Sequence, residues 1–511
     1  MHNSMRLNLM LALLLIIGVA GAAPLNAIPR ADDENATGGW GHICVDQITL
    51  SDTRKAPVIM TDVLYAETYR PQFHFSSQTN WLNDPNGMVY YQGEYHLFFQ
   101  HNPSGIDWGN MTWGHAISKD MVHWKQLPDA IKPDKLGTIF SGSAVIDWHN
   151  TSGFGNGKQP PIVAMYTAAG GTSPESKGAP FTQCIAYSND KGRTFTKFEG
   201  NPVLPHVAAE NRDPKLVWFE PTKSWTLALY LDGDEYALYT SKNLKEWTQL
   251  QKMRMAGSSE CPDFFPLAVQ GENTTRWVLT GANGHYLVGD YDGATFRPEG
   301  EPQPADTGAN YYAVQTYSDI PATDGRRIQI SWMSGGKYPD MPFNQQMSFP
   351  CELTLHRFAE GLRLCRLPVH EIETLYKSSV ALKSFELVPQ EDPLKSKAIS
   401  GDCYDISLEL DPGQASSLVF KIRGETVRYD GHDHNITFLG RTTPIGLVNG
   451  RLKLRVLVDR TTIELFGNDG RVSMSSCFVP HPENHEIGIA VEGTSVHVDS
   501  LIIHSLKSAW K

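Results

Sequence analysis

A polar turn recurs along this chain at intervals that are typical of a repeat architecture, and strand-like patterns surround each copy. In each copy an apolar strand precedes the turn and an aromatic residue re-enters a strand after it. The copies run from Ser118 to Trp124, from Ser188 to Phe195, from Ser241 to Trp247 and, more loosely, from Asp290 to Phe296. The three serines are 70 and 53 residues apart. Repeats on this scale indicate four-stranded sheets arranged radially.

With a fifth unit around Ile328 to Leu355, the pattern predicts a five-bladed β-propeller over residues 66–368. The alternative is that common hairpin turns coincide by chance. Long amphipathic helical stretches are absent from the sequence, which argues against an α/β barrel and for an all-β fold.

A second β domain is predicted over residues 383–511, after a connector at 369–382. Short strands separated by turns favour a β-sandwich there. The expected strands are Tyr404 to Leu410, Ser417 to Ile422, Leu452 to Val458, Thr461 to Phe466, Glu486 to Ala490 and Val496 to Ile503. This region contains no cluster of catalytic type, so we expect a structural or carbohydrate-contacting role.

Residues 1–22 have the pattern of an export signal. Arg6 precedes the mostly apolar run Leu7 to Val19, and Ala20-Gly21-Ala22 supplies small residues for cleavage. A membrane anchor is the alternative, but the apolar run is short for spanning, and no later stretch approaches about 20 apolar residues. The sequence therefore predicts a soluble, secreted protein with an N-terminal extension over residues 23–65.

The charge balance excludes some partners. The chain has 44 Lys and Arg residues against 56 Asp and Glu, a formal charge of −12. A nucleic-acid partner would require a basic face, whereas an acidic surface suits a neutral substrate. No metal-ligand cluster or nucleotide-binding loop indicates a cofactor. The sequence leaves open whether the chain forms a homodimer through its sandwich.

Two further patterns concern an exported chain. Asn-x-Ser/Thr sequons make five asparagines glycan candidates: Asn35, Asn110, Asn150, Asn273 and Asn435. The seven cysteines are odd in number, so at least one has no partner within the chain. None has CxxC spacing, and a bridge between Cys351 and Cys365 is one pairing that the sequence allows.

Three carboxylates stand in similar local settings. Asp84 lies in Trp81-Leu82-Asn83-Asp84-Pro85-Asn86-Gly87, and we expect it on a rigid turn just before a hairpin. Asp213 lies in Arg212-Asp213-Pro214 and Glu260 in Glu260-Cys261-Pro262, each beside a proline and an apolar strand. Singly, these acids fit a turn cap, a structural ion pair and a solvated loop residue.

Together, in successive blades, the three acids could line one end of the propeller channel. Glycoside hydrolysis of the retaining type needs one carboxylate as nucleophile and one protonated carboxyl as acid. Like charges crowded in one cleft raise the pKa of a member of the group, which leaves an acid able to donate its proton.

These motifs resemble glycoside hydrolase family 32, the invertase, inulinase and levanase group. The resemblance runs from about Gln72 to Leu364 and continues more weakly through the sandwich. The matching segments, in the family's order, are 81–87, Phe140-Ser141-Gly142-Ser143, Arg212-Asp213-Pro214 and Glu260-Cys261-Pro262. Asp306-Thr307-Gly308, Tyr311-Tyr312-Ala313 and the sandwich run from Asp459 to Phe466 are also similar to the family.

The resemblance implies a secreted, retaining β-fructofuranosidase that hydrolyses terminal fructosyl bonds of sucrose, inulin or levan. Asp84 would be the nucleophile that forms a fructosyl-enzyme intermediate, and Glu260 the acid and then the base. Asp213, with Arg212, would hold fructose hydroxyls and stabilise the transition state. The residues that would shape the fructose pocket are Trp81, Asn83, Gln100, Trp108, Phe140 and Ser141.

Two segments depart from the family pattern, at Phe343-Asn344-Gln345-Gln346-Met347 and at Cys351. Both are expected near the leaving-group side, where they would affect substrate preference. A fructosyltransferase would use the same residues with a sugar as acceptor in place of water. A non-catalytic fructan-binding protein is a further alternative, although such a protein tends to lose a catalytic acid and all three acids are present here.

Overall fold

The computed structural model describes residues 64–397, 399, 401–413 and 417–510. The predicted export signal (1–22) and nearly all of the predicted N-terminal extension (23–65) therefore lie outside the described residues. Within the described ranges the chain is built from strands, with short 3₁₀ helices η2 (Pro174–Ser176), η3 (Glu220–Thr222) and η4 (His370–Leu375). In this part of the chain we find no helix long and apolar enough to cross a membrane.

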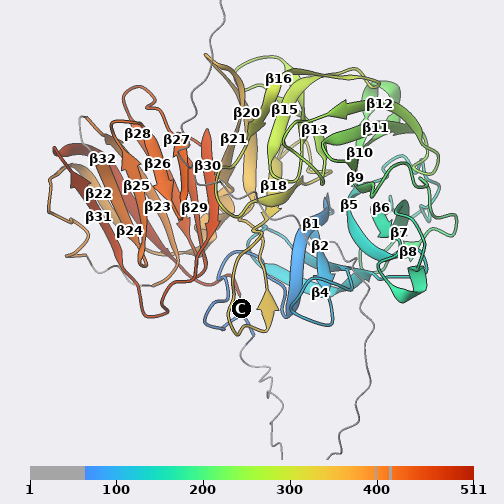
Figure 1. Cartoon of the computed structure of the whole chain (residues 1–511), viewed down its shortest axis with the longest axis horizontal. Helices are drawn as coiled ribbons and strands as arrows, with labels where there is room; N and C mark the ends of the chain where they lie inside the picture. Colours follow the sequence, from blue (N-terminus) through green and yellow to red (C-terminus); the bar gives the residue numbers. More distant parts are fainter. Residues whose placement is uncertain (1–63, 398, 400, 414–416, 511) are drawn as a thin grey trace, which may run out of the picture. The chain divides into compact units, whose positions relative to one another are not determined.

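Five sheets follow one another from Asn80 to Pro368 (Figure 1). The first contains β1 (Asn80–Tyr91), β2 (Glu94–Asn102), β3 (Thr112–Ser118), β4 (Trp124–Ile131) and the short β19 (Phe343–Asn344). The second contains β5 (Thr138–Ile146), β6 (Ile162–Ala169), β7 (Thr182–Ser188) and β8 (Thr196–Lys197). The third contains β9 (Arg212–Phe219), β10 (Ser224–Asp232), β11 (Glu235–Ser241) and β12 (Thr248–Arg254).

The fourth sheet contains β13 (Asp263–Ala268), β14 (Thr275–Thr280), β15 (His285–Tyr291) and β16 (Phe296–Pro304). The fifth contains β17 (Tyr312–Thr316), β18 (Arg327–Trp332), β20 (Cys351–Phe358) and β21 (Gly361–Pro368). The fifth unit predicted around Ile328 to Leu355 thus covers only its two middle strands, because β17 and β21 extend the blade on both sides.

The first strand of each sheet is its inner strand. The inner strands β1, β5, β9, β13 and β17 contact one another in this order, and β17 contacts β1 again. The ring is closed a second time by β19, which pairs in parallel with the start of β1 through Asn80↔Phe343 and Trp81↔Asn344. The predicted five-bladed propeller is confirmed.

The repeated turn lies at the same place in three blades, between the third and the fourth strand. Its serine hydroxyl donates to the side chain two residues later: Ser118 to Asp120 at 3.0 Å, Ser188 to Asp190 at 2.7 Å and Ser241 to Asn243 at 3.2 Å. This bond closes the turn locally. The repeat was detectable in the sequence because the connection between the third and fourth strands uses the same turn residues in these successive blades.

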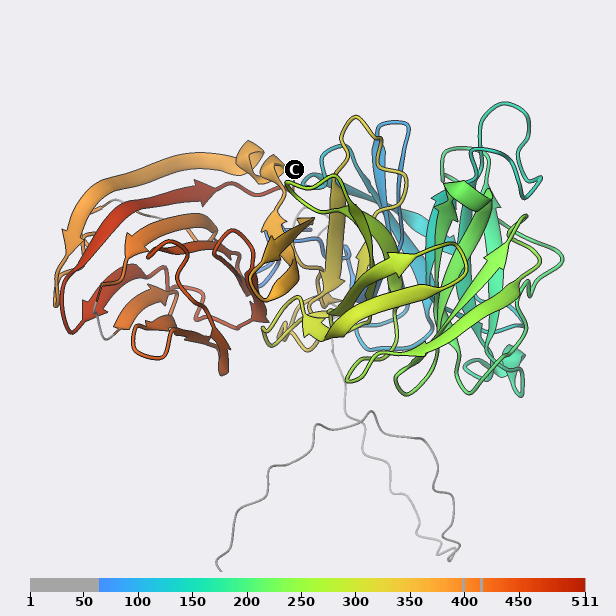
Figure 2. The same cartoon turned by 90° about the horizontal axis from the view of Figure 1, so that it is seen from above.

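The C-terminal region is a sandwich of two sheets (Figure 2). One contains β22 (Tyr376–Leu387), β32 (Val496–Leu506), β23 (Tyr404–Asp411), β28 (Leu452–Val458), β29 (Thr462–Gly467) and β30 (Val472–Cys477). The other contains β27 (Arg441–Pro444), β26 (Asn435–Phe438), β25 (Glu425–Asp430), β24 (Ser417–Ile422) and β31 (Ile487–Glu492).

The six strands expected in the sandwich are all present. The sequence patterns did not reveal β22, β25, β26, β27 and β30, and β22 begins at Tyr376, inside the connector predicted at 369–382. Strand β22 is an edge strand whose residues are mostly exposed, so it lacks the apolar alternation that makes a strand detectable. The inner faces of the two sheets form one apolar core.

The six cysteines in the described ranges are all free thiols. Cys351 and Cys365, for which a bridge was considered, lie in neighbouring strands, but Cys351 is opposite Pro368 and Cys365 is opposite Thr354. The register of the two strands therefore separates these sulfurs, and no bridge joins them.

A buried ionic cluster joins the segment before β1 to the sandwich. His74 is fully buried, and its Nδ1 and Nε2 lie 2.8 Å from Asp459 and 2.7 Å from Glu464. Asp459 also accepts the backbone N–H groups of Gln72, Phe73 and His74 at 2.7–3.1 Å. The two carboxylates raise the pKa of His74 to about 9 against the effect of burial, so the imidazolium form is favoured at neutral pH.

A second buried cluster lies beside it. The guanidinium of Arg366 on β21 donates to Asp306 at 2.8 Å and to Ser473 on β30 at 2.6 Å. The hydroxyl of Ser475 donates to Asp306 at 2.8 Å and lies 3.1 Å from Glu464, which connects the two clusters. Buried charges require such partners, because an unpaired charge in the interior is strongly destabilising.

The cluster around His74 predicts a measurable pH dependence of stability. The folded-state pKa of His74 lies above its ordinary value of 6.5, so its contribution is fully present below pH 6.5 and is lost as the pH rises through about 9. We expect His74→Leu to lower the free energy of unfolding at pH 6 by about 3–5 kcal/mol, because two buried carboxylates lose their cation. Urea titrations followed by fluorescence measure both effects.

His123 provides the matched control for that measurement. It also pairs with an aspartate, Asp120, at 2.8 Å, but its side chain is 45% exposed. We expect His123→Gln to change stability by less than about 1 kcal/mol. A His74→Leu loss no larger than that of His123→Gln would contradict the role assigned to the buried cluster.

Candidate active site

The inner strands run in the same direction through the channel, so their first residues meet at one mouth. Hydrogen bonds at mid-channel show this alignment, since the hydroxyl of Ser143 on β5 donates to the carbonyl of Pro214 and accepts from the N–H of Leu216, both at 2.9 Å and both on β9. Residues that precede this level in each inner strand therefore lie toward the same end of the channel. Asp84, Ser141, Asp213 and the Glu260-Cys261 pair all do.

Asp84 lies within β1 itself, and the expectation of a turn before the hairpin was wrong. The register against β2 shifts between Leu82, which faces His101, and Pro85, which faces Phe99, so one extra residue is inserted here. A bulge of this kind re-aims a side chain while the strand continues. Pro85 and Gly87 are residues typical of turns, but the pairing between β1 and β2 continues through this segment.

Three donors surround the Asp84 carboxylate. Ser141 Oγ donates to Oδ2 at 2.5 Å and Asn83 Nδ2 donates to Oδ1 at 2.9 Å. The Cys261 thiol lies 3.6 Å from Oδ2. Trp81 supports this arrangement, since its indole N–H donates to Asn83 at 2.8 Å. The carboxylate is therefore held in one orientation by Asn83 of the first blade, Ser141 of the second blade and Cys261 in the loop before the fourth blade.

Asp213 is buried and lies in a backbone conformation that is rare for residues other than glycine. Its φ is 64°, and Glu260 and Cys261 also have positive φ values of 54° and 36°. Such conformations are destabilising and gather at functional sites. Here they bring Asp213 Oδ2 to 3.0 Å from the Cys261 N–H and to 3.5 Å from its thiol.

Glu260 is partly exposed, and both of its carboxylate oxygens have partners. Arg212 Nη2 donates to Oε1 at 2.5 Å, and the hydroxyl of Tyr312 donates to Oε2. Arg212 Nε also lies 4.0 Å from Asp213 and its guanidinium lies over the ring of Tyr230. A continuous line of contacts thus runs from Asp84 through Cys261, Asp213 and Arg212 to Glu260.

Burial controls the protonation of this cluster. It raises the pKa of Asp213 to about 7, against the lowering effect of Arg212, and the charges of Glu260 and Asp84 add to the rise. Burial also raises the pKa of Asp84, which Ser141 and Asn83 oppose. Burial and the neighbouring carboxylates raise the pKa of the Cys261 thiol, so it stays protonated and able to donate.

Of the other predicted residues, Trp81 contacts Asn83, Phe140 directly precedes Ser141 in β5, and Trp108 lies at the surface. The Trp108 side chain is 56% exposed and its ring is 5.9 Å from that of Phe140, edge to face. Gln100 is only 2% exposed. It donates at 3.0 Å to Asn86, whose amide in turn donates to Ser141, so Gln100 is joined to the site through these two side chains.

Residues without an assigned role in the sequence analysis complete the site. Cys261 contacts two of the acids and Tyr312 contacts the third, and Trp332 lies between Trp81 and Tyr312, with ring centroids at 6.0 and 6.2 Å. Cys261 and Tyr312 lie within segments that resemble the family, and this resemblance is the feature of the sequence that could have identified them as site residues. Trp332 lay in no motif. In the described ranges no group of three His, Cys, Asp or Glu residues could hold a metal ion.

The two departures from the family pattern have different positions. Gln345 accepts the indole N–H of Trp332 at 3.0 Å, and Asn344 pairs with Trp81, so this segment borders the site. Cys351 does not, because it is fully buried in β20, where Arg366 Nη2 lies 3.8 Å from its sulfur. Its expected place near the leaving-group side was wrong.

Comparison with known proteins adds to this geometry. The model for the glycosyl hydrolases family 32 N-terminal domain matches residues 74–368, and the model for the family's C-terminal region matches residues 371–505. The chain belongs to glycosyl hydrolases family 32. This glycoside hydrolase is 43% identical over 493 residues to a levanase of Bacillus subtilis, covering 87% of this chain and 72% of that one. It is 31% identical over 523 residues to an extracellular exo-inulinase of Aspergillus awamori, covering 87% and 96%.

Solved structures of the family are similar in fold. The exo-inulinase of Aspergillus awamori superposes with a TM-score of 0.79 at 30% identity, covering 87% of this chain and all of that one. The fructofuranosidase of Schwanniomyces occidentalis, complexed with fructose, gives a TM-score of 0.77 at 26% identity over 87% of this chain.

The strained, buried environment of Asp213 predicts that this residue opposes folding when it is charged. Its folded-state pKa lies above the ordinary value of 3.8, so stability is lost as the pH rises from 3.8 through about 7. We expect Asp213→Asn, which keeps an oxygen for the Cys261 N–H, to unfold at a higher temperature than the parent protein at pH 8. The gain should shrink as the pH falls toward 4, and calorimetry at both values tests this. An equal gain at both values would contradict it.

Proposed function

We propose that this family 32 enzyme is a secreted β-fructofuranosidase that releases terminal fructosyl units from sucrose, inulin or levan. The observation that carries the proposal is the line of contacts that gathers Asp84, Asp213 and Glu260 at one mouth of the channel. Its similarity to a levanase and an exo-inulinase supports fructans as substrates. Secretion rests on the predicted signal and on the extracellular relative.

Asp84 is the proposed nucleophile. Its hydrogen bonds to Ser141 and Asn83 favour the ionised form and fix the direction of its lone pairs. Attack on the anomeric carbon of the fructosyl unit would give a covalent intermediate, and the same two donors would support the carboxylate when it leaves. The bulge in β1 orients this side chain.

Glu260 is the proposed acid and base. Arg212 and Tyr312 each occupy one lone-pair site on its two oxygens, so a site remains for the proton that Glu260 gives to the leaving oxygen of the substrate. Since Tyr312 contacts Glu260, Tyr312 and the neighbouring Trp332 border the leaving-group side. In the second half of the reaction Glu260 would accept a proton from the attacking water.

Asp213 is the proposed transition-state stabiliser. Its carboxylate lies between the other two acids, so it faces the hydroxyls of a sugar bound against Asp84. Hydrogen bonds from these hydroxyls would strengthen as positive charge develops on the sugar ring. Trp81, Trp108 and Phe140 are proposed as the aromatic walls of the pocket, with Arg212, Asn83, Gln100 and Ser141 as its polar contacts.

Product analysis tests the proposed function. We expect purified protein to release glucose and fructose from sucrose and free fructose from inulin and levan, resolved by chromatography. We expect Asp84→Ala and Glu260→Ala each to lower kcat by orders of magnitude while the circular dichroism spectrum is unchanged. Transfer products in place of free fructose would favour the transferase, and near-normal turnover of either variant would remove that residue from the mechanism.

The stereochemical outcome tests the roles of the two acids. A nucleophilic Asp84 requires two displacements at the anomeric carbon, so the first fructose released should have the same configuration as the substrate. Proton NMR during the first minutes of hydrolysis, before mutarotation, distinguishes the two anomers. Initial release of the inverted anomer would exclude a covalent intermediate on Asp84.

A further inference from the structure

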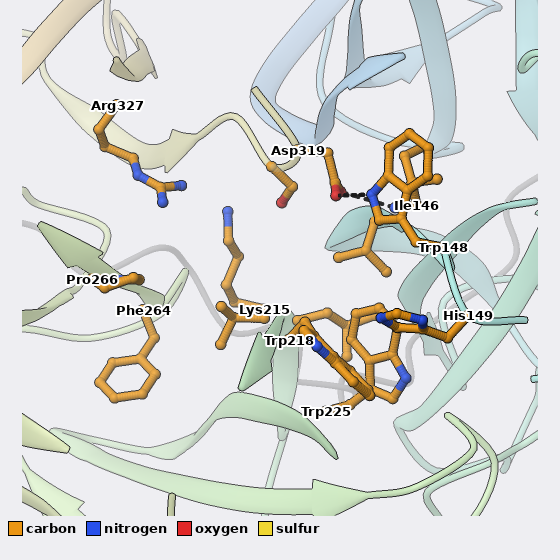
Figure 3. Close-up of a pocket in the computed structure, with 14 residues that line it drawn as sticks. Ile146, Trp148, His149, Lys215, Trp218, Trp225, Phe264, Pro266, Asp319 and Arg327 are labelled. Atoms are coloured by element: carbon orange, nitrogen blue, oxygen red, sulfur yellow. Dashed lines mark hydrogen bonds between the residues drawn. The ribbon is translucent and has the colours of Figure 1, made fainter. Parts of the chain in front are cut away.

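A second hollow lies at the opposite mouth of the same channel. It has a cavity volume of about 250 Å³ and is lined by the end of β5, by residues of β9, β10 and β13 and by residues that follow β17 (Figure 3). We call it the far-mouth pocket, and its polar and aromatic lining includes Trp148, His149, Lys215, Trp218, Asp319 and Arg327. The proposed reaction uses none of these residues.

The aromatic side chains of the far-mouth pocket offer ring faces rather than N–H groups. The indole N–H of Trp148 donates to Asp319 at 2.8 Å, that of Trp218 to Glu220 at 2.6 Å and that of the adjacent Trp225 to Thr151 at 2.8 Å. Trp148 is nevertheless 55% exposed, which is unusual for a tryptophan. Its free face is therefore available to the apolar face of a ligand.

Three charged groups meet beside these rings. The ammonium of Lys215 is buried, donates to the Thr316 carbonyl at 2.8 Å and lies 3.1 Å from Asp263, which leaves one N–H for another partner. Arg327 donates through Nη1 to the Tyr317 carbonyl at 2.9 Å. Figure 3 shows the Lys215 side chain pointing into the space between Arg327 and Asp319.

Asp319 completes the set and is held in a strained conformation. Its φ is 61°, and its two carboxylate oxygens accept the Ile146 N–H at 2.9 Å and the Trp148 indole at 2.8 Å. A carboxylate has about four lone-pair sites, so two remain for a hydroxyl group.

The charges in the far-mouth pocket balance. Lys215 and Arg327 are matched by Asp263 and Asp319, so the pocket has no excess of positive charge to attract an anion. It combines open aromatic faces with both donors and acceptors, which a polyhydroxylated ring can satisfy at once. The volume lies below the roughly 300–1,000 Å³ of pockets for larger ligands, which limits the occupant to one ring.

We propose that the far-mouth pocket is a non-catalytic binding site for a single neutral hexose unit, stacked on Trp148 and hydrogen-bonded to Asp319, Lys215 and Arg327. The inference rests on the lining of this pocket and not on the proposed function of the other mouth. A sugar bound here lies at the opposite end of the channel from Asp84, so it does not compete with substrate for the acids. The site would add a second point of attachment for a saccharide.

Fluorine NMR of the full chain labelled with 5-fluorotryptophan tests the proposal. D-fructose and D-glucose are titrated separately, and the Trp148 and Trp218 signals are assigned from Trp148→Phe and Trp218→Phe. We expect both signals to shift and saturate with at least one of the two sugars. We expect Arg327→Gln to weaken that response roughly tenfold, while the rate of sucrose hydrolysis is unchanged, because Arg327 lies outside the proposed reaction.

Trp108 supplies the matched control, since it is exposed to the same extent, at 56%, but lies at the other mouth. Trp108→Ala should leave the Trp148 response to sugar intact. The proposal is overturned if neither sugar shifts the Trp148 and Trp218 signals, or if Trp108→Ala abolishes the shift. It is also overturned if sodium sulfate moves these signals and the sugars do not, which would identify an anion site.

Discussion

The closed ring of inner strands is the constraint on which the molecule depends. Each inner strand is the first strand of its blade and runs through the channel in the same direction, so five separate segments begin at one mouth and end at the other. Residues far apart in the sequence therefore share an environment without sharing an element. The acids gather at one end for this reason, and Lys215, which starts at mid-channel, lines a pocket toward the other end together with Asp319 and Arg327.

The mouth with the acids is locally unfavourable for folding. It holds the carboxyl groups of Asp84 and Asp213, whose pKa values are raised by burial. Asp213, Glu260 and Cys261 also have positive φ values. Each feature is destabilising, by roughly 1–3 kcal/mol for a strained backbone conformation. The surrounding sheets and the paired charges elsewhere must offset these terms, as is usual where a site is organised for chemistry rather than for stability.

The sandwich contributes to this support through a specific segment. The loop from Asp306 to Asn310 is held by β30, with Thr307 N–H donating to the Ser473 carbonyl at 2.9 Å and Asn310 N–H to the Ser475 carbonyl at 3.0 Å. Gly308 fits there because a Cβ would lie 2.1 Å from the Ser475 carbonyl oxygen. Two residues after this loop, Tyr312 contacts Glu260. The second domain thus positions a partner of the proposed acid, although it supplies no acid itself.

Several features could be read from the sequence because they depend on local chemistry. The Ser-x-Asp/Asn turns, the six detected sandwich strands and the motifs around Asp84, Asp213 and Glu260 each lie within a few consecutive residues. Strand β22 and the position of Cys351 could not be read in this way. Strand β22 is an exposed edge strand defined by its pairing with β32, and Cys351 is buried in a core that joins residues of β1 and β2 to residues of the sandwich.

The sequence by itself therefore determined the all-β character, the repeat and the identity of the three acids. Only the tertiary structure decided that Asp84 lies on a bulge, that Gln100 is joined to Ser141 through Asn86, that Cys261 contacts two of the acids and Tyr312 the third, and that His74 is paired with two sandwich carboxylates. Local patterns record backbone preference and turn chemistry. Contacts between segments hundreds of residues apart arise only when the ring of blades closes and the second domain packs against it.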